Sequence, residues 1–554
     1  PRPHRNPVGV KNRRNVVLGQ MKKYNYLDEV LIDSLKQQPL NLNYTPESHR
    51  EGLATYFREF LRAHMKTWIN DDNNRKPDGS KYNLNTDGLK IYTTINYSMQ
   101  EMAENAVTSH MPRLQKEFFE QNETLDDSIA PFRELTSGAV DTLLRVSMRR
   151  SERWRKMKYD LKKNDEEIEE SFYIPKEMTV FSWAGEIDTT MTPLDSMKYY
   201  KSFFRPGMMS MDPTNGYIKA WVGGMNYRHF QYDMVKKGKR QIGSTFKPFV
   251  YAAAIDQLKL SPCDTFPDSQ FCIEKNKFGN VEQWCPKNSG DKYGRTRTLK
   301  NALANSVNTI TARLMDRIGP RTVVKLAKDL GIEQRILPVP SIALGTPDLS
   351  VYEMVAAYST FANKGVYTQP VFIERIDDKN GTTLYKNQPV TRDVLSEEAA
   401  YVTVNLLEGV TRAGSGTRLR TTGADEFNRA YQNVVTGYPY EFTNPIAGKT
   451  GTTQNQSDGW FIGMVPNLVT GVWVGAEDRA IHFEDIAYGQ GASMALPIWG
   501  GYMKSVYQDS TLLISKESFE RPKRLSIELD CNKFVIDSTS SGKTTDQEIL
   551  DIDF

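Results

Sequence analysis

Apolar positions near the start of the chain recur at helical spacing. Two sets lie close together: Val16, Val17, Leu18 and Met21, then Leu27, Val30, Leu31 and Leu35. This spacing predicts helical structure with a buried face within residues 1–45. Further helices are expected at residues 56–68 and 98–110, and the run at 89–94 between them predicts a strand.

From about residue 205 the pattern changes to short strands and punctuated helices. The apolar run 208–212 is followed by a turn with Asn215-Gly216 and by a second run at 217–222, which predicts an antiparallel hairpin. Helices are expected at 244–257, 298–315, 320–330 and 350–364, and strands return at 460–475. Strands, then helices, then strands indicate an α+β fold with an antiparallel sheet flanked by helices.

Residues 113–172 are dominated by charge. A basic run is followed by an acidic one: Arg145, Arg149, Arg150, Arg153, Arg155, Lys156, Lys158, Lys162 and Lys163, then Asp165, Glu166, Glu167, Glu169 and Glu170. We expect a solvated helical hairpin whose opposite charges pair, with an arm that binds a partner or a membrane surface as the alternative.

Length and composition set broad limits. A chain of 554 residues is too long for one core, so we expect several domains, with boundaries near residues 45, 204 and 510. The polar, Ser/Thr-rich residues 511–554 are expected to form a tail. The net charge of +3 gives no reason to expect nucleic-acid binding. No apolar run reaches the ~18 residues that cross a bilayer, and no signal peptide is visible. Because the chain begins at Pro1, we expect a fragment with any targeting segment upstream.

Three of the four cysteines cluster, at Cys263, Cys272 and Cys285, whereas Cys531 is distant. Clustering favours one disulfide with a thiol left over, and the turn-like residues 276–280 favour the pair Cys272–Cys285. A zinc site is the weaker alternative, because no His and no Cys-x-x-Cys lies nearby. A disulfide would imply an oxidising, extracytoplasmic location.

Three short motifs follow one another along the chain. They are Ser244-Thr245-Phe246-Lys247, Ser306-Val307-Asn308 and Lys449-Thr450-Gly451, which continues into Thr452. The Ser-x-x-Lys spacing also occurs at Ser289/Lys292 and at Ser540/Lys543, in polar surroundings. Only Ser244 opens an apolar helical run, so we expect the Lys247 amine beside the Ser244 hydroxyl on one helix face.

These residue types fit nucleophilic acyl transfer. A serine hydroxyl needs a base, and Lys247 acts as one only if burial or a nearby cation such as Lys449 lowers its pKa. Ser306 is a candidate proton relay, and Asn308 offers a donor and an acceptor to a peptide amide. Free N–H groups at the helix start suit an oxyanion.

Each motif alone has a plainer explanation: a helix cap at Ser244, solvated lysines, and a turn at Lys449-Thr450-Gly451. Their joint occurrence in this order favours the catalytic interpretation. The sequence Gly414-Ser415-Gly416 lacks the setting and the lysine of a phosphate-binding loop. We expect it to be a mobile loop near the site.

Longer stretches around the motifs resemble the class A, bifunctional penicillin-binding proteins. They are residues 240–249, 284–288, 299–308, 448–453 and 458–461. Asn6-Pro7 and residues 13–21 are similar to the last helices of that family's glycosyltransferase domain, whose catalytic glutamates have no counterpart here. The resemblance implies four parts: the end of a glycosyltransferase domain at 1–45, a linker or pedestal at 46–204, a transpeptidase domain at 205–510, and the tail. The charged segment at 113–200 departs from the commonest pattern and stays unassigned.

The resemblance also implies roles and partners. Ser244 would be the nucleophile, Lys247 the base and Ser306 a proton shuttle. Asn308 would bind the peptide amide, while Lys449, Thr450, Gly451 and Thr452 would form the carboxylate site. The backbone N–H groups of Ser244 and Thr452 would form the oxyanion hole. Substrates would be peptidoglycan stem peptides ending in D-Ala-D-Ala, and β-lactams would acylate the serine. No cofactor or metal is expected. The parent protein would be anchored upstream by a membrane helix and face the periplasm, where other cell-wall synthesis proteins would be candidate partners.

Two alternatives to a transpeptidase stay open. Water instead of an amine would resolve the acyl-enzyme in a D,D-carboxypeptidase or a β-lactamase, although the Glu-x-x-Leu-Asn string of class A β-lactamases is missing between the second and third motifs. A non-catalytic β-lactam sensor would keep Ser244 and Lys247 within a signalling protein.

Overall fold

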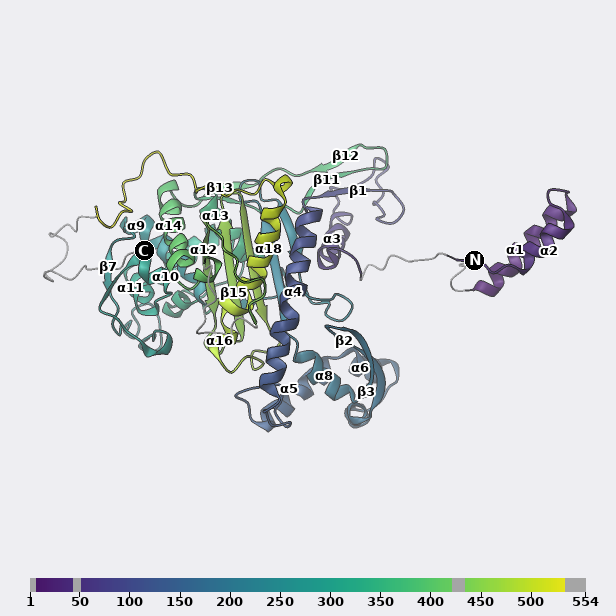
Figure 1. Cartoon of the computed structure of the whole chain (residues 1–554), viewed down its shortest axis with the longest axis horizontal. Helices are drawn as coiled ribbons and strands as arrows, with labels where there is room; N and C mark the ends of the chain where they lie inside the picture. The colour runs from purple at the N-terminus through teal and green to yellow at the C-terminus, as the bar shows by residue number, and fades with distance from the viewer. Residues whose placement is uncertain (1–5, 43–50, 421–433, 534–554) are drawn as a thin grey trace. The chain divides into compact units, whose positions relative to one another are not determined.

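The computed structural model describes residues 6–42, 51–420 and 434–533, and its contacts divide the chain into two units that meet near residue 52 (Figure 1). In the described residues, no helix combines the length and apolarity needed to cross a bilayer. The two units are described separately below.

The N-terminal unit is a helix pair, α1 (Pro7–Lys23) and α2 (Glu29–Gln37). The Asn6 side chain caps α1, and the Arg14 guanidinium donates to carbonyls at the end of α2. The helices expected here are present, but the buried faces are not. Ile32 is the one fully buried hydrophobic side chain among the described residues of this unit, because two helices alone cannot cover a face on each.

The second unit is built on a five-stranded antiparallel sheet in the order β14-β15-β16-β4-β5, which confirms the α+β fold. Its strands are β4 (Arg205–Met211), β5 (Ile218–Val222), β14 (Ala447–Thr452), β15 (Asp458–Val465) and β16 (Leu468–Gly475). The predicted hairpin at 208–222 is the pair β4–β5. β14 lies at one edge of the sheet.

Alternate side chains of the sheet face two hydrophobic cores. Trp460 and Trp473 belong to one core, and their neighbours Phe461 and Val472 belong to the other. Among the helices that contact the sheet or pack in its cores are α4 (Tyr97–Asn122), α9 (Lys247–Leu258), α13 (Val351–Ala362), α14 (Glu397–Ala413) and α18 (Leu496–Gln508). Helices α4 and α18 pack on one another and on the sheet (Figure 1). Both faces are therefore shielded from water, and the sheet is a stiff support.

Helix α4 continues 12 residues beyond the predicted end at residue 110. Pro112 lies inside it and removes one backbone donor. Met111, Leu114 and Phe118 are fully buried on the same helix, and this burial outweighs the lost hydrogen bond. The charged segment therefore does not begin at a structural break near residue 113.

The charged segment folds around a small core of its own. It contains α5 (Ser137–Arg150), α6 (Glu152–Arg155), α7 (Asp165–Glu170), α8 (Pro193–Lys201) and a hairpin of β2 (Lys176–Ser182) and β3 (Gly185–Met191). The basic and acidic runs pair at Arg145–Glu169 and Lys158–Asp165, as the charge pattern predicted. Buried Trp154 and Phe172 make it more than a solvated hairpin.

The remaining elements are short. The helices are α3 (Thr55–Trp68), α10 (Leu299–Ala304), α11 (Asn308–Ile318), α12 (Pro320–Asp329), α16 (Ile486–Gly489) and α17 (Gly491–Met494). A second sheet contains β1 (Lys90–Thr93), β11 (Ile373–Asp377) and β12 (Thr383–Lys386). Three strand pairs complete the fold: β6 (Arg240–Gln241) with β9 (Asp348–Leu349), β7 (Thr265–Pro267) with β8 (Thr296–Thr298), and β10 (Val366–Thr368) with β13 (Thr391–Asp393).

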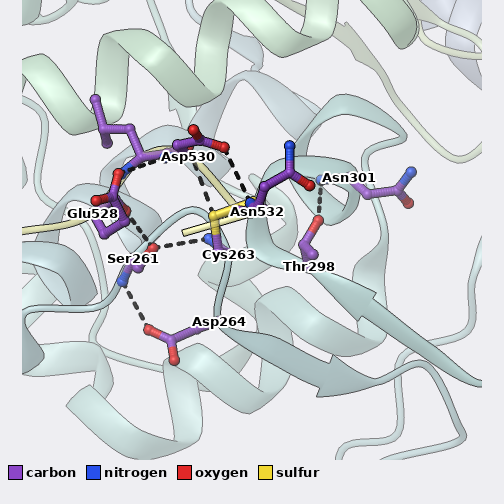
Figure 2. The surroundings of a disulfide bond; sticks show 10 residues. Ser261, Cys263, Asp264, Thr298, Asn301, Glu528, Asp530 and Asn532 are labelled. Atoms are coloured by element: carbon purple, nitrogen blue, oxygen red, sulfur yellow. Dashed lines mark hydrogen bonds between the residues drawn. A yellow bond between two sulfur atoms is a disulfide. The ribbon is translucent and has the colours of Figure 1, made fainter. Parts of the chain in front are cut away.

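All four cysteines form disulfides, which corrects the expectation of a leftover thiol. The predicted pair Cys272–Cys285 is confirmed, and Cys263 pairs with Cys531 across a separation of 268 residues (Figure 2). The Ser261 hydroxyl donates to Glu528 O at 2.6 Å beside that bond. Residues up to 533 thus pack onto the domain, because buried Phe519 and Ile527 add apolar contacts that the polar composition concealed.

Removal of the long-range disulfide should weaken the whole second unit. We expect the double change Cys263→Ser/Cys531→Ser to lower the free energy of unfolding by about 2–5 kcal/mol, because the bond closes the longer loop. Denaturant unfolding measures this loss. Cys272→Ser/Cys285→Ser is the matched control and should cost less. An equal loss in both variants would contradict the prediction.

Candidate active site

Ser244 lies in a tight turn between strand β6 and helix α9. Residues Gly243–Phe246 form a 3-10 turn, and the α-helix begins at Lys247, so the predicted helix at 244–257 has a tighter first turn. Gly243 has a φ of 53° and donates to Gly345 O at 3.0 Å. The turn is therefore held from outside by the loop around residue 345.

A buried ion pair anchors the strand that leads into this turn. Arg240 Nε lies 2.7 Å from Asp458 Oδ1, and Asp458 is fully buried at the start of β15. Trp473 Nε1 donates to the same oxygen at 2.9 Å. Trp460 Nε1 donates to Gln241 O at 2.8 Å. These contacts tie β6 to the central strands of the sheet.

The third motif approaches the turn backbone to backbone. A Cβ on Gly451 would lie 2.8 Å from Ile242 O, and one on Gly243 would lie 2.7 Å from Thr452 O. Both distances are too short for a side chain, so glycine is required at these two positions. The approach brings the end of edge strand β14 against the turn that carries Ser244.

The second motif lies at a break between two helices. The predicted helix at 298–315 is α10 and α11, separated at Ser306, which has a φ of 57°. This left-handed conformation is unusual for a residue with a Cβ. It directs the Ser306 hydroxyl to both lysines of the other motifs. Oγ lies 3.1 Å from Lys247 Nζ and 3.0 Å from Lys449 Nζ.

Both lysines are fully buried, and neither forms an ion pair with a described acidic residue. Burial lowers the pKa of Lys247 well below its ordinary value, and the nearby positive charge of Lys449 lowers it further. Burial lowers the pKa of Lys449 to about 7. The sequence left burial and the nearby charge of Lys449 open as causes of a lowered Lys247 pKa, and burial is the larger of the two.

Asn308 links Lys247 to the segment before the second motif. Its Oδ1 accepts a hydrogen bond from Lys247 Nζ at 2.6 Å, and its Nδ2 donates to Lys287 O at 2.7 Å. One amide hydrogen of Asn308 is left for another acceptor. Lys247 Nζ also donates to Ser306 O.

The expected contact between Lys247 and Ser244 is not formed. Ser244 is partly exposed, and its hydroxyl has no hydrogen-bond partner among the described residues. The cause is local, because the Lys247 amine is directed instead to three oxygens of Ser306 and Asn308. The helix face shared by Ser244 and Lys247 predicted the side on which the Lys247 amine lies. It did not predict that the amine donates to Ser306 and Asn308.

The sequence placed the loop of Ser415 near the site but did not identify Ser415 as a partner of Thr450. Its hydroxyl is hydrogen-bonded to that of Thr450, and its N–H donates to Ala304 O at 3.0 Å. The Gly414-Ser415-Gly416 loop is thus near the motifs, as expected. A Cβ on Gly414 would lie 2.2 Å from Ala304 O, so the loop is packed against the end of α10. Thr452 Oγ1 accepts from the N–H of Gly491 at 3.0 Å.

Two other serines share the Ser-x-x-Lys spacing of Ser244. Ser289 is exposed, and Ser540 is outside the described residues. No group of three or more His, Cys, Asp or Glu in the described ranges is placed to hold a metal ion, and all four cysteines are oxidised. The zinc alternative therefore has no ligand set in this part of the chain.

Family models match most of the second unit. The penicillin binding protein transpeptidase domain matches residues 207–478, and the penicillin-binding protein middle domain matches residues 127–204. The chain belongs to the penicillin-binding proteins. Most of the charged segment that the sequence left unassigned is therefore part of a known domain of this family.

Curated relatives support the class A resemblance. This penicillin-binding protein is 28% identical over 540 residues to penicillin-binding protein 1A of Aquifex aeolicus, covering 94% of this chain and 65% of that protein. The chain spans less than two thirds of the length of the first curated relatives that it matches.

Solved structures share the fold. Penicillin-binding protein 1A from Haemophilus influenzae has a TM-score of 0.60 at 21% identity and covers 93% of this chain and 77% of its own. PonA1 from Mycobacterium tuberculosis in complex with penicillin V has a TM-score of 0.53 at 20% identity, covering 86% and 97%.

Burial of Lys449 should make this penicillin-binding protein less stable at neutral pH. The folded-state pKa is about 7, below the ordinary lysine value of 10.5, so the unfolded chain binds more protons between these limits. We expect Lys449→Met to raise the free energy of unfolding by roughly 2–4 kcal/mol at pH 7, with the gain falling below about 1 kcal/mol near pH 10. Urea unfolding at both pH values measures it.

The exposed Lys325 provides the matched control. Lys325→Met should change stability little, and equally at both pH values, because this exposed side chain makes only a solvated ion pair with Asp329. A gain for Lys449→Met that is the same at pH 7 and pH 10 would contradict the electrostatic explanation.

Proposed function

We propose that the chain is a peptidoglycan D,D-transpeptidase that uses Ser244 as its nucleophile. Ser244 Oγ attacks the carbonyl of the penultimate D-alanine of a stem peptide, and the terminal D-alanine leaves. An amine from a neighbouring stem peptide then displaces the serine and forms the crosslink. The observation that carries the proposal is the pair of buried lysines that share the hydroxyl of Ser306, next to the turn of Ser244.

Lys247 is proposed as the base for the serine proton. A lysine amine accepts a proton only in its neutral form, and the lowered pKa of Lys247 makes that form more available than in an ordinary lysine. Ser306 lies between Lys247 and Lys449, which suits it to pass a proton to the departing amine. The acyl-enzyme is formed when this amine leaves.

The oxyanion is proposed to bind two backbone N–H groups, those of Ser244 and Thr452. The first N–H groups of a helix have no intrahelical acceptor, and the Ser244 turn carries such groups. The close approach of Gly243 to Thr452 supports the second donor. Loss of one such donor typically lowers a rate by about a hundred- to a thousand-fold.

The terminal carboxylate of the substrate is proposed to lie along β14. Lys449 supplies positive charge, and Thr450 and Thr452 supply hydroxyl groups at the edge of the sheet. Gly451 lacks a side chain between them and permits the close approach to the turn. The remaining amide hydrogen of Asn308 is available to a substrate carbonyl.

β-Lactams are proposed to acylate Ser244 in place of the peptide. The structure of PonA1, whose fold this chain shares, was determined in complex with penicillin V. The two disulfides support an oxidising, extracytoplasmic location for this chain. We further propose that the whole protein also carries glycosyltransferase activity, because residues 6–21 resemble the last helices of such a domain.

Labelling with a fluorescent penicillin tests the nucleophile. We expect Ser244→Ala to lower the rate of covalent labelling by at least about a thousandfold, because no other group replaces the hydroxyl. Ser289→Ala, an exposed serine with the same Ser-x-x-Lys spacing, is the matched control and should label at the native rate. Continued labelling of Ser244→Ala would exclude this serine.

Product analysis tests the reaction class. With a donor peptide ending in D-Ala-D-Ala and an amine acceptor, we expect a crosslinked product and release of D-alanine, since the amine competes with water for the acyl-enzyme. Omission of the acceptor should leave only slow hydrolysis. D-Alanine release that is equally fast without the acceptor would indicate a carboxypeptidase, and no release at all would indicate a sensor.

A further inference from the structure

Helix α11, which begins with Asn308, has no capping side chain of its own. Its N-cap residue, Val307, carries no oxygen in its side chain. The cap comes instead from Asn288, a residue 20 positions earlier. Asn288 Oδ1 accepts from the N–H of Asn308 at 3.0 Å and from that of Thr309 at 3.1 Å. Two of the first N–H groups of α11 are thereby satisfied.

Asn288 is itself held rigidly. Its Nδ2 donates to Asp268 Oδ1 at 2.7 Å and to Lys292 O at 3.0 Å, so both hydrogens and the oxygen of its amide are used. Asp268 is fully buried and also accepts from Arg297 Nε at 2.7 Å and from Thr309 Oγ1 at 2.9 Å. The adjacent Lys287 O receives the side chain of Asn308.

The hydrogen bonds of Asn288 and Asn308 lead to Lys247, the proposed base. Asn308 is gripped at its backbone by Asn288 and at its Nδ2 by Lys287 O, which leaves its Oδ1 directed to Lys247 Nζ at 2.6 Å. The disulfide Cys272–Cys285 closes the hairpin that delivers residues 287 and 288. None of these residues contributes a reacting group, and each acts through its neighbour.

We propose that Asn288, supported by Asp268, is a positioning residue that sets the side chain of Asn308 and through it the Lys247 amine. The inference rests on the proposed function, because it concerns the geometry of that base. Asn288 acts mainly on the acylation step and only weakly on initial binding, which uses one remaining hydrogen of the Asn308 amide. It stands outside the three motifs.

The first test compares Asn288→Ala with Asn280→Ala in stopped-flow acylation by a fluorescent penicillin. Asn280 is a matched control, since its amide bonds Glu274 O and Glu282 O in the same hairpin and does not contact α11. We expect Asn288→Ala to lower the acylation rate constant about ten- to a hundred-fold, with the binding constant within about twofold. Asn280→Ala should acylate at the native rate.

The second test uses the near-isosteric change Asn288→Asp, which keeps the cap oxygen. The new carboxyl would face Asp268 and Arg297. The charged residues Lys287, Asp291 and Lys292 are close to it in sequence. The charge that acts directly on the Lys247 amine is that of Lys449. Two adjacent carboxyls share a proton at low pH and repel at high pH. We expect acylation relative to the native protein to be within about threefold at pH 4.5, where such a pair keeps a proton, and at least about tenfold lower at pH 7.5.

Failure of the positioning role of Asn288 and failure of the proposed function give different results. Normal acylation by Asn288→Ala, alongside loss of labelling in Ser244→Ala, overturns the positioning role and leaves the nucleophile in place. A pH-independent ratio for Asn288→Asp also overturns it. Labelling that persists in Ser244→Ala removes the proposed function first. If Asn288→Ala does not fold, the pH series of Asn288→Asp still decides.

Discussion

The site depends on the burial of two lysines around one hydroxyl group. Lys247 and Lys449 are both fully buried, and both contact Ser306 Oγ within 3.1 Å. Burial makes the charged form of both amines costly, which lowers both pKa values, and the charge of Lys449 lowers the pKa of Lys247 further. The arrangement persists only if the surrounding elements hold it rigidly. A sheet with cores on both faces supplies that rigidity.

The buried carboxylate of Asp458 pairs with groups other than the two lysines. Asp458 follows Thr452 by six positions and is fully buried, but its oxygens are used by Arg240, Trp473 and Ser457. A carboxylate free to pair with Lys247 would stabilise the ammonium and raise its pKa. The Arg240–Asp458 pair therefore anchors the strand before Ser244, and no described acidic residue forms an ion pair with either lysine.

The sequence predicted what depends on local spacing and failed where distant contacts decide. The hairpin at 208–222, the pair Cys272–Cys285 and the order of the three motifs follow from short patterns. The continuation of α4 through Pro112 depends on side chains buried against other helices, and Cys531 pairs with a residue 268 positions away. The loop of Ser415 was expected near the site, but its contact with Thr450 was not predicted for the same reason, since only folding brings the two residues together.

The contacts of Lys247 explain how its amine can change protonation state without a movement of the backbone. Three oxygens surround its amine, which matches the three N–H bonds of an ammonium group. A neutral amine has two N–H bonds and one lone pair. After loss of one proton, Lys247 therefore accepts a hydrogen bond in one of the three contacts in which it donated before. Ser306 is the partner that permits this reversal, because its hydroxyl can donate, whereas Ser306 O and Asn308 Oδ1 only accept. Lys449 donates to the same hydroxyl and makes it a stronger donor. The rigid support and the relay are therefore compatible, because only protons need to move among these side chains.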